Sequence, residues 1–304
     1  MVRKIISQIL KKVIMKNRTK NIGKVLVMSI LAFGFVFQLS AQEEKKEDKR
    51  PVRSPFDATL LIDNPTYVNP YKGGLDLTIH HRFGTFGNGT TDLWGIYAPS
   101  NIRLGLDYGI TSNFSVGIGT EKNSKMQDVH WKYNILNQTR DGSIPIAIAY
   151  YGNMVIDARH ADNFGANYKF TNRLSYFHEL IIGRKFSEKL SIQGAFGYAH
   201  FNAVDSINSN DYMAISIGGR YKIWNSNSII FEYDLPFSMY ARSFSVLPKS
   251  NYAIGMEFST STHAFQVFIA NFDKIISQKN FGYNQNDFFA GDILLGFNIT
   301  VRLQ

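Results

Sequence analysis

The stretch DILLGFNITVRL, residues 292–303, alternates apolar and polar side chains along most of its length. Every odd-numbered position from Ile293 to Leu303 is apolar, whereas Asn298, Thr300 and Arg302 lie between them. Successive side chains of a strand point to opposite faces, so this segment would show apolar groups to one medium and polar groups to another. The pattern predicts a β-strand at a boundary between two media.

Eleven further segments have the same alternation, and most of them are 9 to 14 residues long. A strand that crosses a bilayer needs about 9–11 residues, whereas strands of soluble proteins average about five or six. The expected strands are residues 74–84, 99–110, 114–122, 128–137, 143–151, 172–185, 190–201, 211–223, 228–235, 250–259, 263–271 and 291–303. The sequence therefore predicts an all-β fold, a transmembrane antiparallel up-and-down β-barrel of about 12 strands.

The connections between these strands alternate in length. Short inner connections are expected at residues 111–113, 138–142, 187–189, 225–227 and 260–262. The outer connections are residues 85–98, 123–127, 152–171, 202–210, 236–249 and 272–290, and five of these six are long. An outer-membrane barrel has short periplasmic turns and longer external loops, so the alternation favours a barrel over a soluble sandwich.

One face of each strand is apolar and would contact lipid, whereas the other face carries charge. The candidates for lining a lumen are Asp76, His80, Arg82, Arg103, Asp107, His130, Lys132, Glu179, Arg220, Glu232, Asp234, Glu257 and Arg302. Buried charges are costly unless they are paired or hydrated, so the lumen is expected to be wet or cross-linked by ion pairs. Three interpretations stay open: these residues brace the barrel, line a path for a small polar solute, or form a catalytic or metal site.

The N-terminal region has the organisation of an exported protein. Residues 1–41 combine a basic segment, an apolar run of about fifteen residues and the small residues Ser40 and Ala41, which predicts a secretory signal peptide. Residues 42–55 are almost wholly charged and are expected to form a disordered periplasmic arm. Residues 56–73 form a lead-in, either a short helix or a plug in the barrel mouth, and residues 74–304 form the barrel.

Charge and cysteine content exclude several classes of function. The leader holds eight of the 33 Lys and Arg residues, which leaves 25 against 24 Asp and Glu. The basic pI of the whole chain therefore belongs to the leader, and nucleic acid is not expected as a partner. The chain has no cysteine, which excludes disulfides, a thiol nucleophile and thiolate metal sites.

A motif near the first strand carries a family resemblance. His81-Arg82-Phe83-Gly84-Thr85 ends that strand, and it is preceded by Asn64-Pro65-Thr66 and by Gly73-Gly74-Leu75-Asp76-Leu77. With these residues the chain resembles a family of uncharacterised bacterial outer-membrane β-barrel proteins that is classed as a domain of unknown function. The resemblance implies an outer-membrane location and a barrel over nearly the whole mature chain, and it implies no reaction.

Catalytic and metal sites have weak support in the sequence. His80 and His81 are neighbours in a strand and would point to opposite faces, so they cannot share one metal ion without a bulge. His80 with Arg82 could bind an anion, although a salt bridge from Arg82 to Asp76 or Asp107 is the simpler expectation. An outer-membrane lipid hydrolase would need a Ser and His pair, and His160, His178 and His263 have no serine motif beside them. No cofactor is expected.

Together these observations predict a small-solute channel or facilitator of the bacterial outer membrane. Its charged lumen would carry a small polar solute, and its outer loops, above all residues 152–171 and 272–290, would control access. The other partners expected are membrane lipid and the barrel-assembly machinery. The alternative from another class is a barrel with a closed lumen that binds or scaffolds a partner.

Overall fold

A computed structural model of the chain describes residues 47–224, 226–239 and 246–303. The predicted signal peptide and the first part of the predicted arm lie outside these residues. Asp48–Gln304 forms one compact unit, and it is the part described below. Its strands are β1 (Leu75–Thr85), β2 (Asn101–Gly109), β3 (Phe114–Glu121), β4 (Met126–Leu136), β5 (Ala147–Asp157), β6 (Leu174–Lys185), β7 (Leu190–Phe201), β8 (Asp211–Trp224), β9 (Asn227–Ser238), β10 (Asn251–Ser259), β11 (His263–Ala270) and β12 (Leu294–Leu303).

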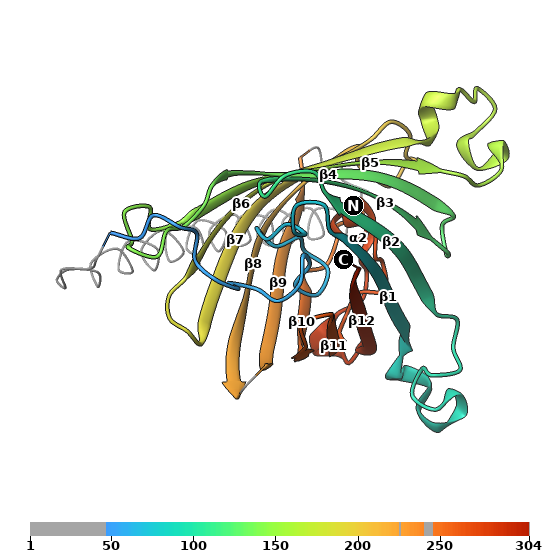
Figure 1. Ribbon diagram of the computed structural model, residues 1–304. Helices are drawn as coiled ribbons and strands as arrows, with labels where there is room; N and C mark the ends of the chain where they lie inside the picture. Colours follow the sequence, from blue (N-terminus) through green and yellow to red (C-terminus); the bar gives the residue numbers. More distant parts are fainter. Residues whose placement is uncertain (1–46, 225, 240–245, 304) are drawn as a thin grey trace, which may run out of the picture. The chain divides into compact units, whose positions relative to one another are not determined.

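These twelve strands form one closed antiparallel barrel in which each strand pairs with its neighbours in sequence, and β1 closes the ring against β12 (Figure 1). The closing seam runs from Leu75 opposite Leu303 to Thr85 opposite Leu294. Closure gives every strand two neighbours, so no row of backbone amides is left unpaired at a sheet edge. The predicted fold, a twelve-stranded up-and-down barrel, is confirmed.

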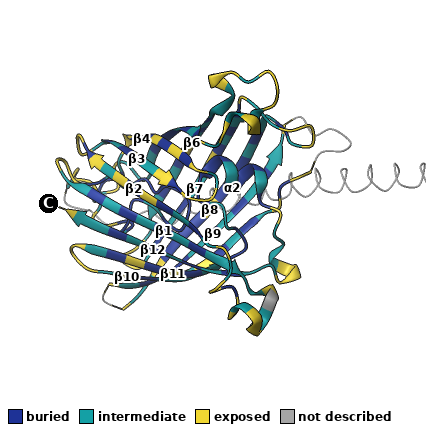
Figure 2. Cartoon of the chain, turned by 90° about the vertical axis from the view of Figure 1, so that its right-hand side faces the viewer, coloured by how far each residue is buried: buried dark blue, intermediate teal, exposed yellow. Residues whose placement is uncertain are grey.

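Burial alternates along the strands, as Figure 2 shows. Ile118 of β3 is 57% exposed and Ile254 of β10 is 50% exposed, whereas the inward Arg82 is fully buried. An exposed apolar side chain at every second position around a closed barrel forms a belt suited to lipid tails. The period of two in the sequence therefore separates an apolar outside from a filled inside.

The helical segments lie between strands. They are η1 (Phe86–Asp92), η2 (Ala161–Phe164), η3 (Phe170–Arg173), α2 (Ser277–Tyr283) and η4 (Phe288–Ala290). Among the residues that the structure describes, no helix has the length and apolar character needed to cross a membrane.

The two ends of the barrel differ, and we call them the turn end and the loop end. The turn end holds the start of β1, the end of β12 and the connections β2–β3, β4–β5, β6–β7, β8–β9 and β10–β11. The loop end holds the longer connections, among them the one from β11 to β12 that contains α2. Both helices and long loops therefore concentrate at one end, as the alternating connection lengths predict.

The boundaries of β5 differ from the prediction of residues 143–151. The strand begins at Ala147 and continues to Asp157, so the β4–β5 connection, residues 137–146, is longer than expected. Pro145 has no amide to donate to a ladder. Thr139 and Asp141 also hydrogen-bond the backbone of Ile144 and Ser143, which holds this segment in a turn instead of a strand.

The interior is not polar on all sides, which corrects the expectation of a uniformly hydrophilic inner face. Strands β6, β7, β8 and β9 each place apolar side chains on the inner face. We call this set the apolar wall: Phe177, Ile181, Ala199, Ala214 and Ile230. Strands β2 and β4 place charged side chains and a histidine on the inner face. We call this set the charged wall: Arg103, Asp107, Asp128, His130 and Lys132. The lumen therefore has two chemically different sides.

Candidate functional site

The lumen is occupied by the chain's own N-terminal segment, which runs inside the barrel (Figure 1). Before it, the backbone of Pro51 pairs with that of Thr139 in the β4–β5 turn, and the N–H of Val52 donates to the carbonyl of Gln138, so this part of the chain contacts the barrel. The segment then turns back on itself, with a bridge between Leu60 and Pro65. We call residues 56–68 the plug.

Two carboxylates of β9 bind the tip of the plug. Oε2 of Glu232 accepts the backbone N–H groups of Ile62, Asp63 and Asn64 at 3.3, 3.1 and 3.0 Å. The Nδ2 of Asn64 donates to Asp234 at 2.6 Å. A carboxylate that accepts several amides is a strong, charge-assisted anchor, so Glu232 fixes the backbone of the tip.

Arg82 of β1 holds the same tip from the opposite side. Its guanidinium donates to the carbonyl of Ile62 at 3.3 Å, lies 3.5 Å from the carboxylate of Asp63, and donates to Asn298 at 2.9 Å. It also lies over the ring of Phe268, 4.6 Å from the centroid. The prediction that Arg82 pairs with Asp76 or Asp107 is wrong, because Arg82 pairs with Asp63 of the plug. Asp63 lies outside the strands, so strand alternation could not predict this pair.

Glycines of the barrel make room for the apolar side of the plug. A Cβ at Gly218 would lie 2.4 Å from Cδ2 of Leu61, and a Cβ at Gly183 would lie 2.0 Å from Cε1 of Tyr67. Leu61 and Tyr67 are almost fully buried there. These contacts are shorter than any real Cβ packing distance, so any other residue at these two positions would displace the plug.

A lid formed by the β11–β12 connection covers the plug from the loop end. Phe281 of α2 packs edge-on against Phe177 with 5.2 Å between ring centroids. Asn280 donates to Asp63 of the plug at 2.5 Å, and Gln278 donates to Asn153 of β5 at 2.8 Å. Lid and plug therefore form one continuous packed layer across the apolar side of the lumen.

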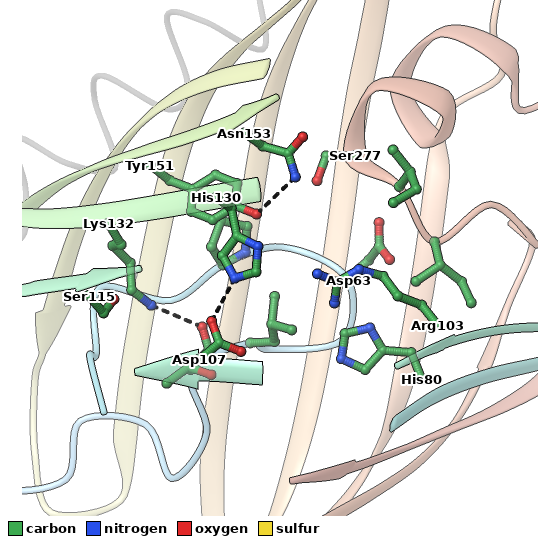
Figure 3. A pocket seen from close by; sticks show the side chains of 15 residues that line it. Asp63, His80, Arg103, Asp107, Ser115, His130, Lys132, Tyr151, Asn153 and Ser277 are labelled. Atoms are coloured by element: carbon green, nitrogen blue, oxygen red, sulfur yellow. Dashed lines mark hydrogen bonds and ion pairs between the residues drawn. The ribbon is translucent and has the colours of Figure 1, made fainter. Parts of the chain in front are cut away.

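The charged wall is an ion-paired network. Arg103 donates two hydrogen bonds to Asp128, at 2.8 and 2.7 Å. The two ring nitrogens of His130 lie 2.8 Å from Asp128 and 2.7 Å from Asp107; Figure 3 shows the contact with Asp107. Lys132 of the same strand donates to the carbonyl of Thr59 in the plug at 3.2 Å. Most of these charges are paired within the wall, and Lys132 ties the wall to the plug.

Two cavities lie next to the plug, and the smaller one borders the charged wall. The small cavity, about 30 Å³, is lined by His80, by Lys132 and other residues of the charged wall, and by Ser277 of the lid segment (Figure 3). This volume has room for about two water molecules, since one water molecule needs about 10–15 Å³. The chamber, about 450 Å³, lies at the turn end. Thr59 of the plug lines both.

The structure places the thirteen lumen candidates on the inner side of the barrel, and eleven of them are buried. Asp107 and Arg302 keep partial exposure. Arg103, Asp107 and His130 meet in one network, Arg82, Glu232 and Asp234 hold the plug tip, and Arg220 pairs with Asp57 of the plug at 2.6 Å. Glu257 accepts from Gln266 at 2.9 Å. Neither carboxylate oxygen of Glu179 has a hydrogen-bond partner among the described residues. Their role in solute passage stays a prediction.

Sequence reasoning missed Asp128, which is the shared partner of Arg103 and His130. Its strand parity is that of His130 and Lys132, so the alternation contained the signal. It also missed Asp57, Asp63 and Asn64, for which no strand parity exists. Within the described residues no group of three or more His, Cys, Asp or Glu side chains is arranged to hold a metal ion. His80 is buried inside, whereas His81 stacks on Phe297 of the outer face.

The fold and the apolar outer belt define a membrane-bound β-barrel. The model of the family described as Membrane bound beta barrel domain (DUF5777) matches residues 56–303, so the chain belongs to this family. The match includes the plug as well as all twelve strands. No curated protein sequence matches the chain.

Solved structures of membrane barrels are similar in fold at low sequence identity. An outer membrane channel from Pseudomonas putida F1 is 9% identical with a TM-score of 0.50, over 80% of this chain and all of that chain. The NanC porin is 11% identical with a TM-score of 0.48, over 76% and 99%. The outer membrane phospholipase A from Escherichia coli is 11% identical with a TM-score of 0.42, over 79% and 93%. These likenesses concern the fold alone.

Proposed function

We propose that this protein is a small-solute channel of the bacterial outer membrane, exported by its N-terminal signal peptide and closed in the conformation described here. The observation that carries the proposal is a pair of cavities that share Thr59 of the plug: the chamber at the turn end, and the small cavity, which borders the charged wall. A path along this wall would offer a solute water and charged groups throughout. The turn end would face the periplasm, and the outer belt would contact membrane lipid after insertion by the assembly machinery.

Two contacts would close this path. Between the cavities, Lys132 donates to the carbonyl of Thr59 and brings wall and plug together. At the loop end, Ile275, Ile276 and Ser277 of the lid border the small cavity. Opening would need the lid segment to move, while the plug could stay anchored by Glu232 and Arg82. Residues 272–290 would then control access where they border the small cavity.

The alternative is a non-conducting barrel that binds or scaffolds a partner. The observation in its favour is the packing of Leu61, Tyr67 and Phe281 against the other side of the lumen, which resembles a protein core. A lipid hydrolase has less support, because His178 hydrogen-bonds Tyr150, His263 hydrogen-bonds Thr262, and His160 pairs with Asp162. None of these partners is a serine nucleophile.

Planar-bilayer recording of lid variants tests the proposal. The chain has no cysteine, so Asn153→Cys with Gln278→Cys introduces two thiols and no others, at a contact that joins the lid to β5. A short reducible bifunctional thiol reagent should abolish conductance, and a reductant should restore it. The reagent on the cysteine-free protein is the control. Shortening residues 273–289 to a brief linker should increase conductance.

The outcomes separate the two functions. Steady steps that the cross-link suppresses support a path beneath the lid. If wild-type and loop-shortened proteins are both silent although folded, the channel is wrong and the binding barrel is favoured. If conductance is unchanged by the cross-link, the path does not run beneath the lid.

A further inference from the structure

One carboxylate in the lining of the chamber has no hydrogen-bond or ion-pair partner among the described residues. It belongs to Asp76 of β1, which is only 6% exposed. The other carboxylate at the chamber, Asp57, is bound by Arg220 at 2.6 Å. A buried carboxylate without a counter-charge is costly, so its position in the lining of a cavity points to a ligand.

Apart from the exposed Lys72, which also lines the chamber, the cations near Asp76 are committed to other groups. Arg302 lies directly opposite Asp76 in the β1–β12 ladder, yet its guanidinium donates to the backbone carbonyls of Asp57, Thr260 and Ser261. Lys132 donates to the carbonyl of Thr59. Neither cation lies within ion-pairing distance of Asp76. The carboxylate therefore keeps its capacity to bind a positive group from the chamber.

Around Asp76 the chamber is rich in neutral hydrogen-bonding side chains. Four asparagines and a glutamine line it: Asn69, Asn113, Asn134, Asn137 and Gln138. Within the described residues, Oδ1 of the buried Asn134 and Oη of Tyr67 have no hydrogen-bond partner. Amide and phenol groups of this kind bind hydroxyl and amine groups of a solute, because each can donate or accept.

We propose that the chamber is a binding site for a small hydroxylated organic cation, with Asp76 as the counter-ion of the solute's ammonium group and the neutral side chains as partners of its hydroxyls. Pockets for organic ligands begin at roughly 300 Å³, so the chamber fits a solute of about the size of one sugar ring. An ammonium hydrogen-bonded to a carboxylate forms a charge-assisted pair, and such pairs are about twice as strong as neutral ones. The site deepens the proposed channel by naming the class of solute, and only its role in passage rests on that function.

Equilibrium binding to the detergent-solubilised full barrel tests the site without any need for conductance. Glucosamine, glucose and glucuronate have nearly the same size and differ in charge, so titration calorimetry with each isolates the charge preference. Wild-type protein should bind glucosamine at least about tenfold more tightly than glucose, and glucuronate most weakly; tenfold corresponds to about 1.4 kcal/mol. Asp76→Asn should reduce glucosamine binding to the level of glucose. Glu188→Gln removes a carboxylate at the same end, exposed and outside the chamber, and should bind like wild type.

Equal affinity for glucosamine and glucose, or a preference for glucuronate, would overturn the assignment. So would an Asp76→Asn variant that is folded, with an intact unfolding transition, and still prefers glucosamine. A barrel that binds glucosamine but never conducts would keep the site and reject the channel. A barrel that conducts and shows no preference among the three sugars would do the reverse.

Discussion

Asp76 and Arg302 face each other across the seam that closes the barrel, and they do not form an ion pair. Directly opposed residues of an antiparallel pair lie close enough for their side chains to interact. Arg302 instead reaches the plug, where it donates to the carbonyl of Asp57, and the turn, where it donates to Thr260 at 2.8 Å. The two residues of this pair therefore act on different parts of the interior. Arg302 binds the plug, and Asp76 lines the chamber.

Arg302→Gln should loosen the base of the plug. The substitution removes charge-assisted bonds to backbone carbonyls, which are worth about 1.5–3 kcal/mol each at most. We expect faster hydrogen exchange of residues 56–59, with exchange in β6 and β7 unchanged. Lys189→Gln, which removes an exposed cation at the same end, is the control. Unchanged exchange in the plug would show that Arg220 alone anchors Asp57.

Gly218→Val should destabilise the folded barrel by about 1–3 kcal/mol, because the new side chain overlaps Leu61 of the plug. Leu61→Ala in the same chain should recover part of this loss by vacating the space. The free energy of unfolding in denaturant, measured for both single variants and the double variant, gives the coupling. Additive effects would contradict contact between Gly218 and the plug.

Lys132→Glu should shift ion selectivity of the conducting barrel towards cations, since Lys132 borders the small cavity. Reversal potentials in a salt gradient measure the shift, with the exposed Lys189→Glu as the matched control. Arg82 and Arg103 are also among the lumen-lining candidates that the sequence indicates. Arg82 is fully buried in contacts with the plug, Asn298 and Phe268, so Arg82→Glu should unfold the plug instead of tuning selectivity. A Lys132→Glu barrel with wild-type selectivity would exclude a path along the charged wall.

The lid should dock more firmly as the pH rises. Burial lowers the pKa of Lys279 in α2 to about 8, with nearby Arg159 adding to the effect. Between about pH 8 and the ordinary Lys pKa of 10.5, the docked lid binds fewer protons than the free lid, so docking strengthens with pH in this window. Protease cleavage within residues 271–293 should therefore slow between pH 7.5 and pH 9.5. Lys279→Met should abolish this dependence; a dependence that persists would assign it to another group.

The barrel itself could be predicted from the sequence because its signal is local. In β12 the alternation from Leu294 to Leu303 fixes which side chains face lipid, and the same period recurs in the other strands. The boundary of β5 could not be predicted so well, because local hydrogen bonds of Thr139 and Asp141 override an apolar pattern at Ile144. A turn of this kind depends on contacts that hydrophobic periodicity does not record.

The contacts between the plug and the barrel could not be predicted from the sequence, for a different reason. Glu232 binds the backbone of Ile62, Asp63 and Asn64 across about 170 residues of sequence, and no spacing rule links them. One sign was present in β6, where Phe177 and Ile181 are apolar on the face that should be polar. Strands apolar on both faces are typically buried on both faces. That departure marks the wall against which plug and lid pack.

Single-channel recording with one introduced cysteine tests the central claim most directly. Ser115→Cys places a thiol at the small cavity beside the charged wall, and Ala214→Cys places one in the apolar wall. A charged methanethiosulfonate reagent added from the turn side should reduce the conductance of Ser115→Cys and leave Ala214→Cys unchanged. Block of Ala214→Cys with Ser115→Cys unaffected would contradict a path along the charged wall.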